Sequence, residues 1–328
     1  MIDLIKEKKS DISLSKEELI LGISRLRKER NAIILAHYYQ EADVQDIADF
    51  IGDSLQLSQQ AAKTNADVIV FAGVHFMAET AKILSPEKTV LIPDLEAGCS
   101  LADSCKAEDF KEFLKAYPNH TVISYVNTTA EIKSLTDIIC TSSNALGIVK
   151  SLPESEKIVF APDKNLGNYI MSITGRDMVI WNGACHVHER FSLEKILKLK
   201  EENPEAKIIA HPECEKPVLL ISDFIGSTST LLKFVEKDEA GSYIVCTESG
   251  ILHQMSKLLF NKKFIPAPPN DSTCACNDCQ FMKLITLKKI YLSLKNNRFE
   301  ITLNEDIRKK AELPIRRMLE LSDKLGFK

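Results

Sequence analysis

Residues 33–55 read IILAHYYQEADVQDIADFIGDSL, and this stretch sets the pattern of the whole chain. It begins with a short apolar run typical of a buried strand, continues through a polar segment led by His37 and an amphipathic stretch, and ends in a turn that carries Ser54. The same layout returns in residues 122–146, VISYVNTTAEIKSLTDIICTSSNAL, and 208–231, IIAHPECEKPVLLISDFIGSTSTL. Each lead residue stands 17 positions before a hydroxyl residue, in the pairs His37–Ser54, Tyr125–Ser142 and His211–Thr228.

Each copy continues through a second strand (VIVFAG, KIVFAP or YIVCTE), a helix and a third strand to a cysteine: Cys99, Cys185, and a run that ends at Cys279. Strands that alternate with helices are typical of parallel sheets. We therefore predict an α/β fold of three homologous three-layer αβα domains with parallel sheets around a pseudo-threefold axis. The predicted domains are residues 1–113 with an N-terminal helix, 114–200, and 201–328 with C-terminal helices. A solenoid or a chance likeness among βαβ units is the alternative.

The residues that carry chemistry all follow the ends of predicted strands. In parallel α/β sheets, the loops after the carboxyl ends of the strands collect ligands. We therefore expect the lead residues, the hydroxyl turns and the cysteines to converge on one central cleft.

Charge and hydropathy exclude two classes of partner. A formal net charge of −4 gives no electrostatic reason to expect nucleic acid or an anionic membrane as partner. The longest apolar runs, such as residues 32–36 and 68–72, are strand-sized and too short to span a bilayer. Residues 1–16 lack the apolar core and cleavage site of a signal peptide. We expect a cytoplasmic protein.

Nine cysteines are many for a cytoplasmic chain, where thiols are core residues, metal ligands or redox groups. Cys140, Cys214 and Cys246 lie in or against apolar stretches, so we assign them to the core, with Cys105 as a spare thiol. The run of Cys274, Cys276 and Cys279 resembles half of a zinc site, but no second pair completes it. If each unit gives one ligand, two of these three are a reducible pair or idle.

Three thiolates that meet from three units suit a soft metal or a cubane cluster. A 4Fe–4S cluster held by only three cysteines leaves one iron without a protein ligand, and that iron can act as a Lewis acid. A single cysteine after a strand is more often a small core residue, so the hypothesis depends on the three acting together.

Polar groups occupy matched positions after the first strand of each unit, as general acid–base chemistry requires. They are His37, Tyr39 and Gln40 in the first unit, Tyr125 and Asn127 in the second, and His211 and Glu213 in the third. Ser54, Ser142 and Thr228 directly precede helical patterns, so we predict that they are helix N-caps. Three helix N-termini in one cleft also bind anions, which indicates a small polyanionic substrate.

Several motifs in order resemble the quinolinate synthase family of NAD biosynthesis. They are AHYYQ, DFIGDSLQLS, YVNTTAEIK, PDKNLG, WNGACHVH, HPEC, GSTS, TESGILHQM and CNDCQFMK, and they extend from about residue 36 to 290. The resemblance implies that iminoaspartate and dihydroxyacetone phosphate condense to quinolinate, phosphate and water. It also implies L-aspartate oxidase or aspartate dehydrogenase as the functional partner that supplies iminoaspartate.

The resemblance also assigns site residues. It implies that a 4Fe–4S cluster is held by Cys99, Cys185 and Cys279. It implies that substrate is bound by His37, Ser54, Tyr125, Val126, Asn127, Ser142, His211, Pro212, Glu213 and Thr228. Among these, His37, Tyr125, His211 and Glu213, together with Tyr39, are the candidate catalytic residues, and His186 lies close to the chemistry. The chain departs from the family pattern at Gln280 and at residues 285–287, beside Cys279.

Two rival functions remain at this point. A hydro-lyase of the aconitase kind shares a three-cysteine cluster but draws its cysteines from one region, which the wide spacing here opposes. A cysteine-rich zinc or redox-sensing module would bind zinc or no metal instead of iron and sulfide. An inactive α/β scaffold would not need the matched polar groups.

Overall fold

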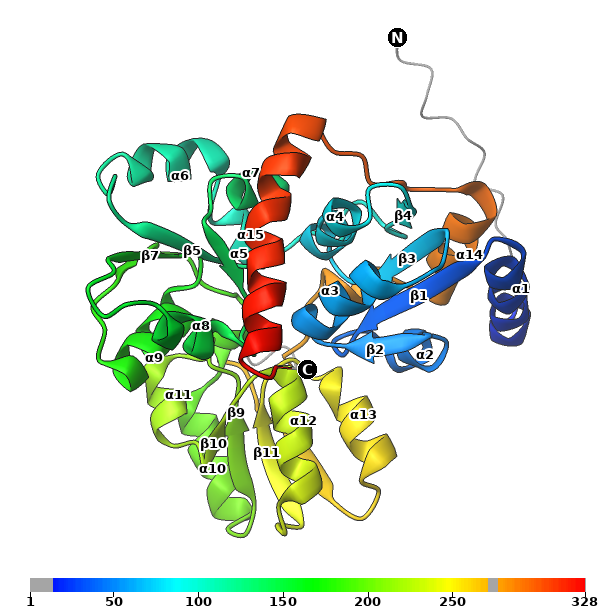
Figure 1. The fold of residues 1–328 in the computed structure, drawn as a ribbon. Helices are drawn as coiled ribbons and strands as arrows, with labels where there is room; N and C mark the ends of the chain where they lie inside the picture. The colour runs from blue at the N-terminus through cyan, green and yellow to red at the C-terminus, as the bar shows by residue number, and fades with distance from the viewer. Residues whose placement is uncertain (1–13, 271–276, 328) are drawn as a thin grey trace.

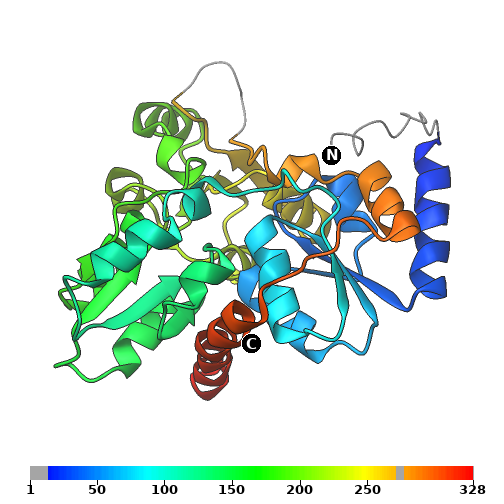
Figure 2. The ribbon, with the colours of Figure 1, turned by 90° about the horizontal axis from the view of Figure 1, so that it is seen from above.

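The computed structural model describes residues 14–270 and 277–327 and contains three parallel sheets of four strands. Their strand orders are β2-β1-β3-β4, β6-β5-β7-β8 and β10-β9-β11-β12, so the three sheets share one topology. Helices cover the sheets in three lobes that surround a common centre (Figures 1 and 2). This confirms the predicted three-layer α/β domains.

The first domain is built on β1, which pairs with β3 along residues 32–36 and with the short β2 at its end. These strands are apolar on both faces because helices cover both sides of a parallel sheet. The elements are α1 (Lys16–Glu29), β1 (Ala32–His37), α2 (Ala42–Asp46), β2 (Phe50–Gly52), α3 (Ser54–Lys63), β3 (Val68–Ala72), α4 (His75–Leu84), β4 (Thr89–Leu91) and α5 (Ser100–Asp103).

The second domain repeats this arrangement around β5, which lies between β6 and β7. Its elements are α6 (Ala107–Leu114), β5 (Thr121–Tyr125), α7 (Ala130–Lys133), β6 (Ile138–Cys140), α8 (Ala145–Ser151), β7 (Ile158–Ala161), α9 (Lys164–Thr174), β8 (Val179–Ile180) and the 3-10 turn η1 (His188–Arg190).

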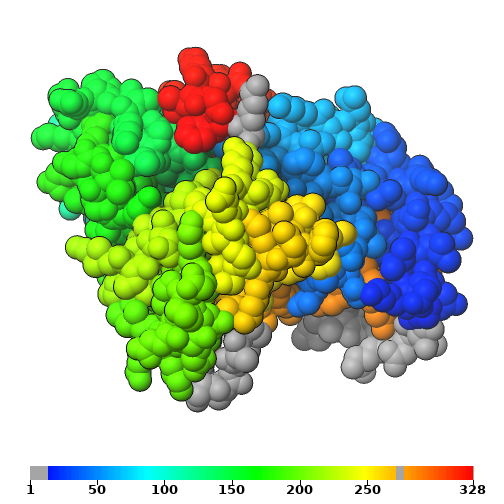
Figure 3. Space-filling view, turned by 90° about the horizontal axis from the view of Figure 1, so that it is seen from below, coloured from blue at the N-terminus to red at the C-terminus, as the bar shows by residue number. Residues whose placement is uncertain are grey.

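The third domain is built around β9, between β10 and β11. Its elements are α10 (Leu193–Glu202), β9 (Lys207–Ala210), α11 (Lys216–Leu220), β10 (Phe224–Ile225), α12 (Thr228–Lys237), β11 (Ser242–Cys246), α13 (Ile251–Leu258) and β12 (Lys263–Pro266). Seen from below, this domain covers the junction between the other two (Figure 3).

Four helices pack outside the sequence repeat to which they were assigned. In α6, Phe110 is buried in a cluster with Val122 of the second sheet, and in α10 Ile196 is buried with Ile208 of the third. The helix that precedes each central strand thus packs on the sheet that this strand begins, as α1 does on β1. The boundaries 1–113, 114–200 and 201–328 stay predictions.

The C-terminal helices leave the third domain altogether. After the turn η2 (Met282–Leu284), α14 (Leu287–Asn296) packs against α1 and β3 of the first domain. The long α15 (Glu305–Lys324) runs between the first and second domains and contacts α4, α7 and β6 (Figure 1). The chain end therefore joins the first two domains. Within the described ranges, no helix is long and apolar enough to cross a membrane.

Candidate functional site

One cavity lies at the centre of the three domains. It lies at the carboxyl ends of the central strands, as the sequence predicts. The predicted site residues that line it are His37, Tyr39, Ser54, Cys99, Tyr125, Asn127, Ser142, Cys185, His186, His211, Glu213, Thr228 and Cys279. Val126 and Pro212 are buried beside it but are not part of its wall.

The two lead histidines of the cavity are neutral hydrogen-bonding groups. Burial lowers the pKa of His37 to about 4 and that of His211 to about 3. The backbone N–H of Tyr39 donates to Nδ1 of His37 over 3.2 Å, and Nε2 of His211 lies 3.1 Å from the hydroxyl of Ser142. At neutral pH both imidazoles therefore donate or accept a hydrogen bond without carrying charge.

Three cysteines, one from each predicted domain, contribute to the same cavity wall. Cys99 is the residue before α5, Cys185 follows β8, and Cys279 precedes η2. Burial raises the pKa of Cys99 to about 12 and that of Cys279 to about 11, and it raises the pKa of Cys185 well above its ordinary value. Negative charge on Cys279 raises the pKa of Cys99 further, and the charge of Glu213, followed by that of the other two cysteines, raises the pKa of Cys185. These thiols hold their protons until a metal displaces them.

Two buried carboxylates hold the backbone next to these cysteines. Asp163 accepts a hydrogen bond from the N–H of Cys185 over 3.3 Å, and Glu248 accepts one from the N–H of Cys279 over 3.1 Å. Glu248 also pairs with Lys283, whose Nζ lies 3.0 Å away. Asp163 and Glu248 follow the second strands of their domains at matching positions, so the repeat supplies the same support twice.

Of the other six cysteines, four are core residues and two lie outside the described residues. Cys140, Cys214 and Cys246 are buried in apolar surroundings, which confirms their assignment to the core, and Cys105, predicted to be a spare thiol, is a core residue as well. Cys274 and Cys276 lie outside the described residues, so the prediction of a pair or of idle thiols there stays a prediction.

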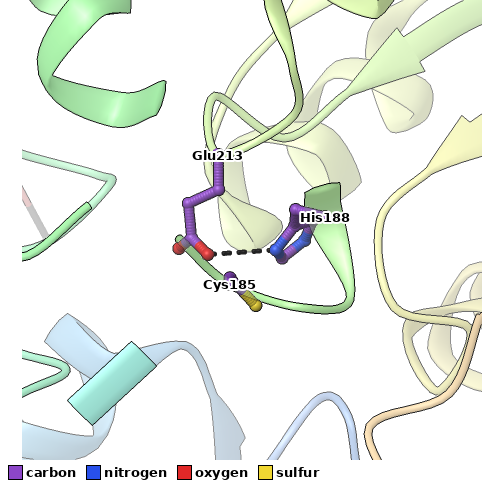
Figure 4. A group of neighbouring side chains, drawn as sticks. All are labelled: Cys185, His188 and Glu213. Atoms are coloured by element: carbon purple, nitrogen blue, oxygen red, sulfur yellow. Dashed lines mark hydrogen bonds and ion pairs between the residues drawn. The ribbon is translucent and has the colours of Figure 1, made fainter. Parts of the chain in front are cut away.

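Glu213 is the centre of a hydrogen-bonded group beside Cys185 (Figure 4). Its carboxylate accepts from the hydroxyl of Tyr125 over 2.5 Å and lies 3.0 Å from Nδ1 of His188. Burial opposes ionisation, but His188, His211 and these hydrogen bonds lower the pKa of Glu213 below its ordinary value. Glu213 is therefore an ionised acceptor.

The group of Cys185, His188 and Glu213 also has the composition of a metal site, since one ligand atom from each lies within 4.8 Å of the others. Both ring nitrogens of His188 already have protein partners, because Nε2 lies 2.9 Å from the hydroxyl of Thr247. A single metal ion here would have to replace these hydrogen bonds. The geometry favours a hydrogen-bonded network at this point and leaves the thiol of Cys185 for a group in the cavity.

The ionised carboxylate fixes the direction of a chain of hydrogen bonds. Because Glu213 can only accept, Nδ1 of His188 donates to it, and in the neutral tautomer of His188 that has its proton on Nδ1, Nε2 accepts from Thr247. The hydroxyl oxygen of Thr247 in turn accepts from Tyr39 over 2.8 Å, and the oxygen of Tyr39 accepts from Thr228 over 2.8 Å. A continuous path thus connects Glu213 to the phenol of Tyr39 through residues of all three domains.

The prediction that Ser54, Ser142 and Thr228 cap helices is wrong. The cap of α3 is Asp53 and the cap of α12 is Ser227, each with a side chain that accepts backbone N–H groups. The residue before α8 is Asn144. Neighbouring capping residues compete for the same free N–H groups, and the extended residue one position earlier makes the bond. The hydroxyls of Ser54, Ser142 and Thr228 therefore do not cap these helices, and the three residues line the cavity instead.

Similarity to known proteins agrees with this geometry. A family described as Quinolinate synthetase A protein matches residues 22–320. The chain belongs to the quinolinate synthetase A family. Relatives named quinolinate synthase from Trichormus variabilis and Microcystis aeruginosa are each 61% identical over 306 residues, which cover 93% of this chain and 94% and 96% of theirs. A third, from Thermosynechococcus vestitus, is 59% identical over 305 residues, 93% of this chain and 96% of its own.

For a member of the quinolinate synthetase A family, the donor set around the cavity is consistent with an iron–sulfur cluster. The three partly buried thiols face one cavity from separate domains, and soft thiolates are the usual ligands of such clusters. The amide oxygen of Asn127 is buried and has no hydrogen-bond partner within the described protein, so it is available to a bound molecule.

Several residues of the site were missed by sequence reasoning. His188, Thr247 and Glu248 line or support the cavity, yet only the motifs that contain them were noted. The signal was present for two of them. Thr247 and Glu248 directly follow the second strand of the third unit, and Asp163 follows the second strand of the second unit. The repeat therefore indicates that polar residues after the second strands also belong to the site.

Proposed function

We propose that this protein forms quinolinate from iminoaspartate and dihydroxyacetone phosphate, with release of phosphate and water, in NAD biosynthesis. The observation that carries the proposal is that three cysteines, distant in sequence, line one cavity together with the acid–base group around Glu213. Family membership and relatives named quinolinate synthase support it.

The proposed cofactor is a 4Fe–4S cluster held by Cys99, Cys185 and Cys279. With three protein ligands, such a cluster supplies a Lewis-acidic iron that polarises an oxygen of the substrate. The hydrogen bonds from the N–H groups of Cys185 and Cys279 to Asp163 and Glu248 support this ligand set, because they hold both loops in place.

Another set of cavity residues would hold the carboxylates of the substrate. The hydroxyls of Ser54, Ser142 and Thr228 come from three domains, and Asn127 offers an amide without a protein partner at its oxygen. Thr228 is also the first residue of α12, where free backbone N–H groups attract anions, whereas at the start of α3 the N–H groups of Leu55 and Gln56 are already bonded to Asp53. The hydroxyls and N–H groups are donors that match the carboxylates of a small dicarboxylate, whereas the amide oxygen of Asn127 accepts from an N–H or O–H of the bound molecule.

Proton transfer would depend on Glu213 and the two phenols. Glu213 is ionised and is the base of the site, with Tyr125 bonded to it directly and Tyr39 connected through His188 and Thr247. Burial raises the pKa of both tyrosines well above their ordinary values, so each enters the reaction as a protonated phenol. His37 and His211 orient the substrate as neutral imidazoles.

The experiment that tests the function is anaerobic purification followed by an assay for quinolinate from the two substrates. Iron and acid-labile sulfide are measured in the same sample. We expect about four irons and four sulfides per chain and quinolinate formation that depends on both substrates. Zinc in place of iron would favour the binding-module alternative, and a cluster without quinolinate formation would favour another hydro-lyase.

The supply of iminoaspartate by L-aspartate oxidase or aspartate dehydrogenase follows from the same proposal. Iminoaspartate hydrolyses in water, so a supplying enzyme must act close by in time or space. Mixing this protein with either enzyme and aspartate tests the partnership through the yield of quinolinate. The cytoplasmic location stays a prediction.

A further inference from the structure

Asp53 is a buried carboxylate in the cavity wall whose hydrogen bonds reach all three domains. Its Oδ1 accepts from the backbone N–H groups of Leu55 and Gln56, each over 3.1 Å, at the start of α3. Its Oδ2 accepts from the hydroxyl of Ser143 in the second domain over 2.7 Å and from that of Ser229 in the third over 2.5 Å. One side chain therefore joins three loops.

Each bonded loop carries one of the cavity hydroxyls. Ser143 follows Ser142 in the chain, Ser229 follows Thr228, and Ser54 follows the carboxylate itself. Asp53 is thus next in the chain to Ser54, and the two serines bonded to it are next to Ser142 and Thr228, three of the hydroxyls that line the cavity. Moving Asp53 would change the spacing of all three.

The arrangement is not a simple product of the repeat. The positions equivalent to Asp53 are occupied by Thr141 in the second unit and by Ser227 in the third. Ser227 lies with its hydroxyl 2.8 Å from that of Ser143, and so adds to the contact between the domains. Only the first unit places an acid at this position, and the other two units turn hydroxyls towards it.

We propose that Asp53 is a positioning residue that sets the distance between Ser54, Ser142 and Thr228 and thereby fits the cavity to a dicarboxylate. The inference rests on the proposed function, because it takes these hydroxyls as the groups that hold the substrate. The proposal also predicts the direction in which ligand affinity changes when the charge of Asp53 is removed. A negative charge beside an anion-binding wall repels the ligand, so removing the charge should tighten binding unless its positioning effect is larger.

The substitution Asp53→Asn separates this role from helix capping. Asparagine caps helices as well as aspartate does, so Oδ1 still accepts the two N–H groups of α3. An amide NH₂ replaces Oδ2, so the hydroxyls of Ser143 and Ser229 lose their shared acceptor. Asp53→Ala removes the cap as well. Asn304→Ala is the matched control, because Asn304 caps α15 by the same two-donor pattern away from the cavity.

The experiment compares these variants as anaerobically purified proteins with their metal content intact. Hydrogen–deuterium exchange of the ligand-free proteins measures how often the loops around Ser142 and Thr228 open. Titration with quinolinate measures the affinity of the cavity for this ligand. For Asp53→Asn we expect about tenfold faster exchange in the peptides around Ser142 and Thr228, and about tenfold weaker quinolinate binding. The iron content should match the wild type, and the melting temperature should fall by no more than several degrees, because two hydrogen bonds to a charged acceptor are lost while the helix cap is kept. Asn304→Ala should leave both the exchange of these peptides and quinolinate binding unchanged.

A second variant keeps the charge and removes the donors. Ser143→Ala combined with Ser229→Ala should weaken quinolinate binding to a similar extent, and it decides the question if Asp53→Asn does not fold. Quinolinate binding as tight as wild type or tighter in both variants overturns the proposal, as does unchanged loop exchange. If the wild type itself binds no quinolinate, the proposed function fails, while the exchange data still decide whether Asp53 holds the loops.

Discussion

Replacing Glu213 by glutamine should remove most of the activity while leaving the fold intact. The side chain is 3% exposed and accepts hydrogen bonds from Tyr125 and His188. Glutamine has the same shape but presents one acceptor and one donor group. If its oxygen faces Tyr125, its NH₂ meets the N–H of His188, and the imidazole must then change to the other tautomer.

The change of tautomer reverses the whole chain of hydrogen bonds. Nε2 of His188 would donate to Thr247, Thr247 to Tyr39, and Tyr39 to Thr228, so every group keeps a partner. The variant therefore exchanges two bonds to a charged acceptor for two neutral ones, at about 1 kcal/mol each, or about 2 kcal/mol of stability. The phenol of Tyr39, however, now directs its proton away from the base.

The rate should fall much further than the stability. Loss of a positioned base typically lowers kcat by about 10² to 10⁴, equivalent to about 3–5 kcal/mol in the barrier. Quinolinate formation is measured anaerobically at equal iron content, and stability by urea unfolding. Glu312→Gln is the control, because Glu312 pairs with arginines on α15 away from the cavity. A Glu213→Gln enzyme with more than a tenth of the wild-type kcat would refute the role of Glu213 as base.

Three further predictions concern the rest of the site. Alanine at any one of Cys99, Cys185 or Cys279 should abolish both the iron–sulfur absorption and the activity, and a full cluster in one of these variants would contradict the ligand set. Thr247→Val should lower kcat about tenfold with little change in KM, because it cuts the path to Tyr39, and Thr247→Ser should restore the rate. Burial lowers the pKa of His211 to about 3, so below pH 6.5 the unfolded chain binds a proton that the folded one does not, and stability rises with pH between about 3 and 6.5. His211→Gln should flatten the slope of unfolding free energy against pH by about 1.4 kcal/mol per pH unit in urea titrations between pH 5 and 6, and an unchanged slope would show that His211 titrates normally.

The sequence predicts the central strands and their convergence, because the repeat makes them visible three times. The strand-sized run at residues 32–36 is β1, which ends at His37, and the apolar run that begins the third unit at residue 208 is β9, at Lys207–Ala210. The edge strands β2, β6 and β10 were not predicted. Each has only two or three residues, and such a run carries no period of its own; it pairs because β1, β5 or β9 already presents a free edge.

Side-chain roles were harder to predict where similar residues are neighbours. Ser227 and Thr228 both carry hydroxyls at the start of α12, and only the backbone conformation decides that Ser227 caps the helix and that Thr228, its first residue, lines the cavity. The position of α15 between the first two domains could not be predicted either. The sequence of an amphipathic helix shows which face is apolar, but it does not show which surface that face packs against.

Threefold repetition explains how the residues converge, and divergence explains how the site can act on an asymmetric molecule. Two positions after each lead residue stand Tyr39, Asn127 and Glu213, a phenol, an amide and a carboxylate at equivalent points of the three units. Three identical groups would offer a substrate three equivalent orientations, and these offer one. The bonds that organise them cross between domains, from Tyr125 to Glu213 and from Tyr39 to Thr228. No single domain therefore holds a complete acid–base group, and the chemistry requires all three domains in contact.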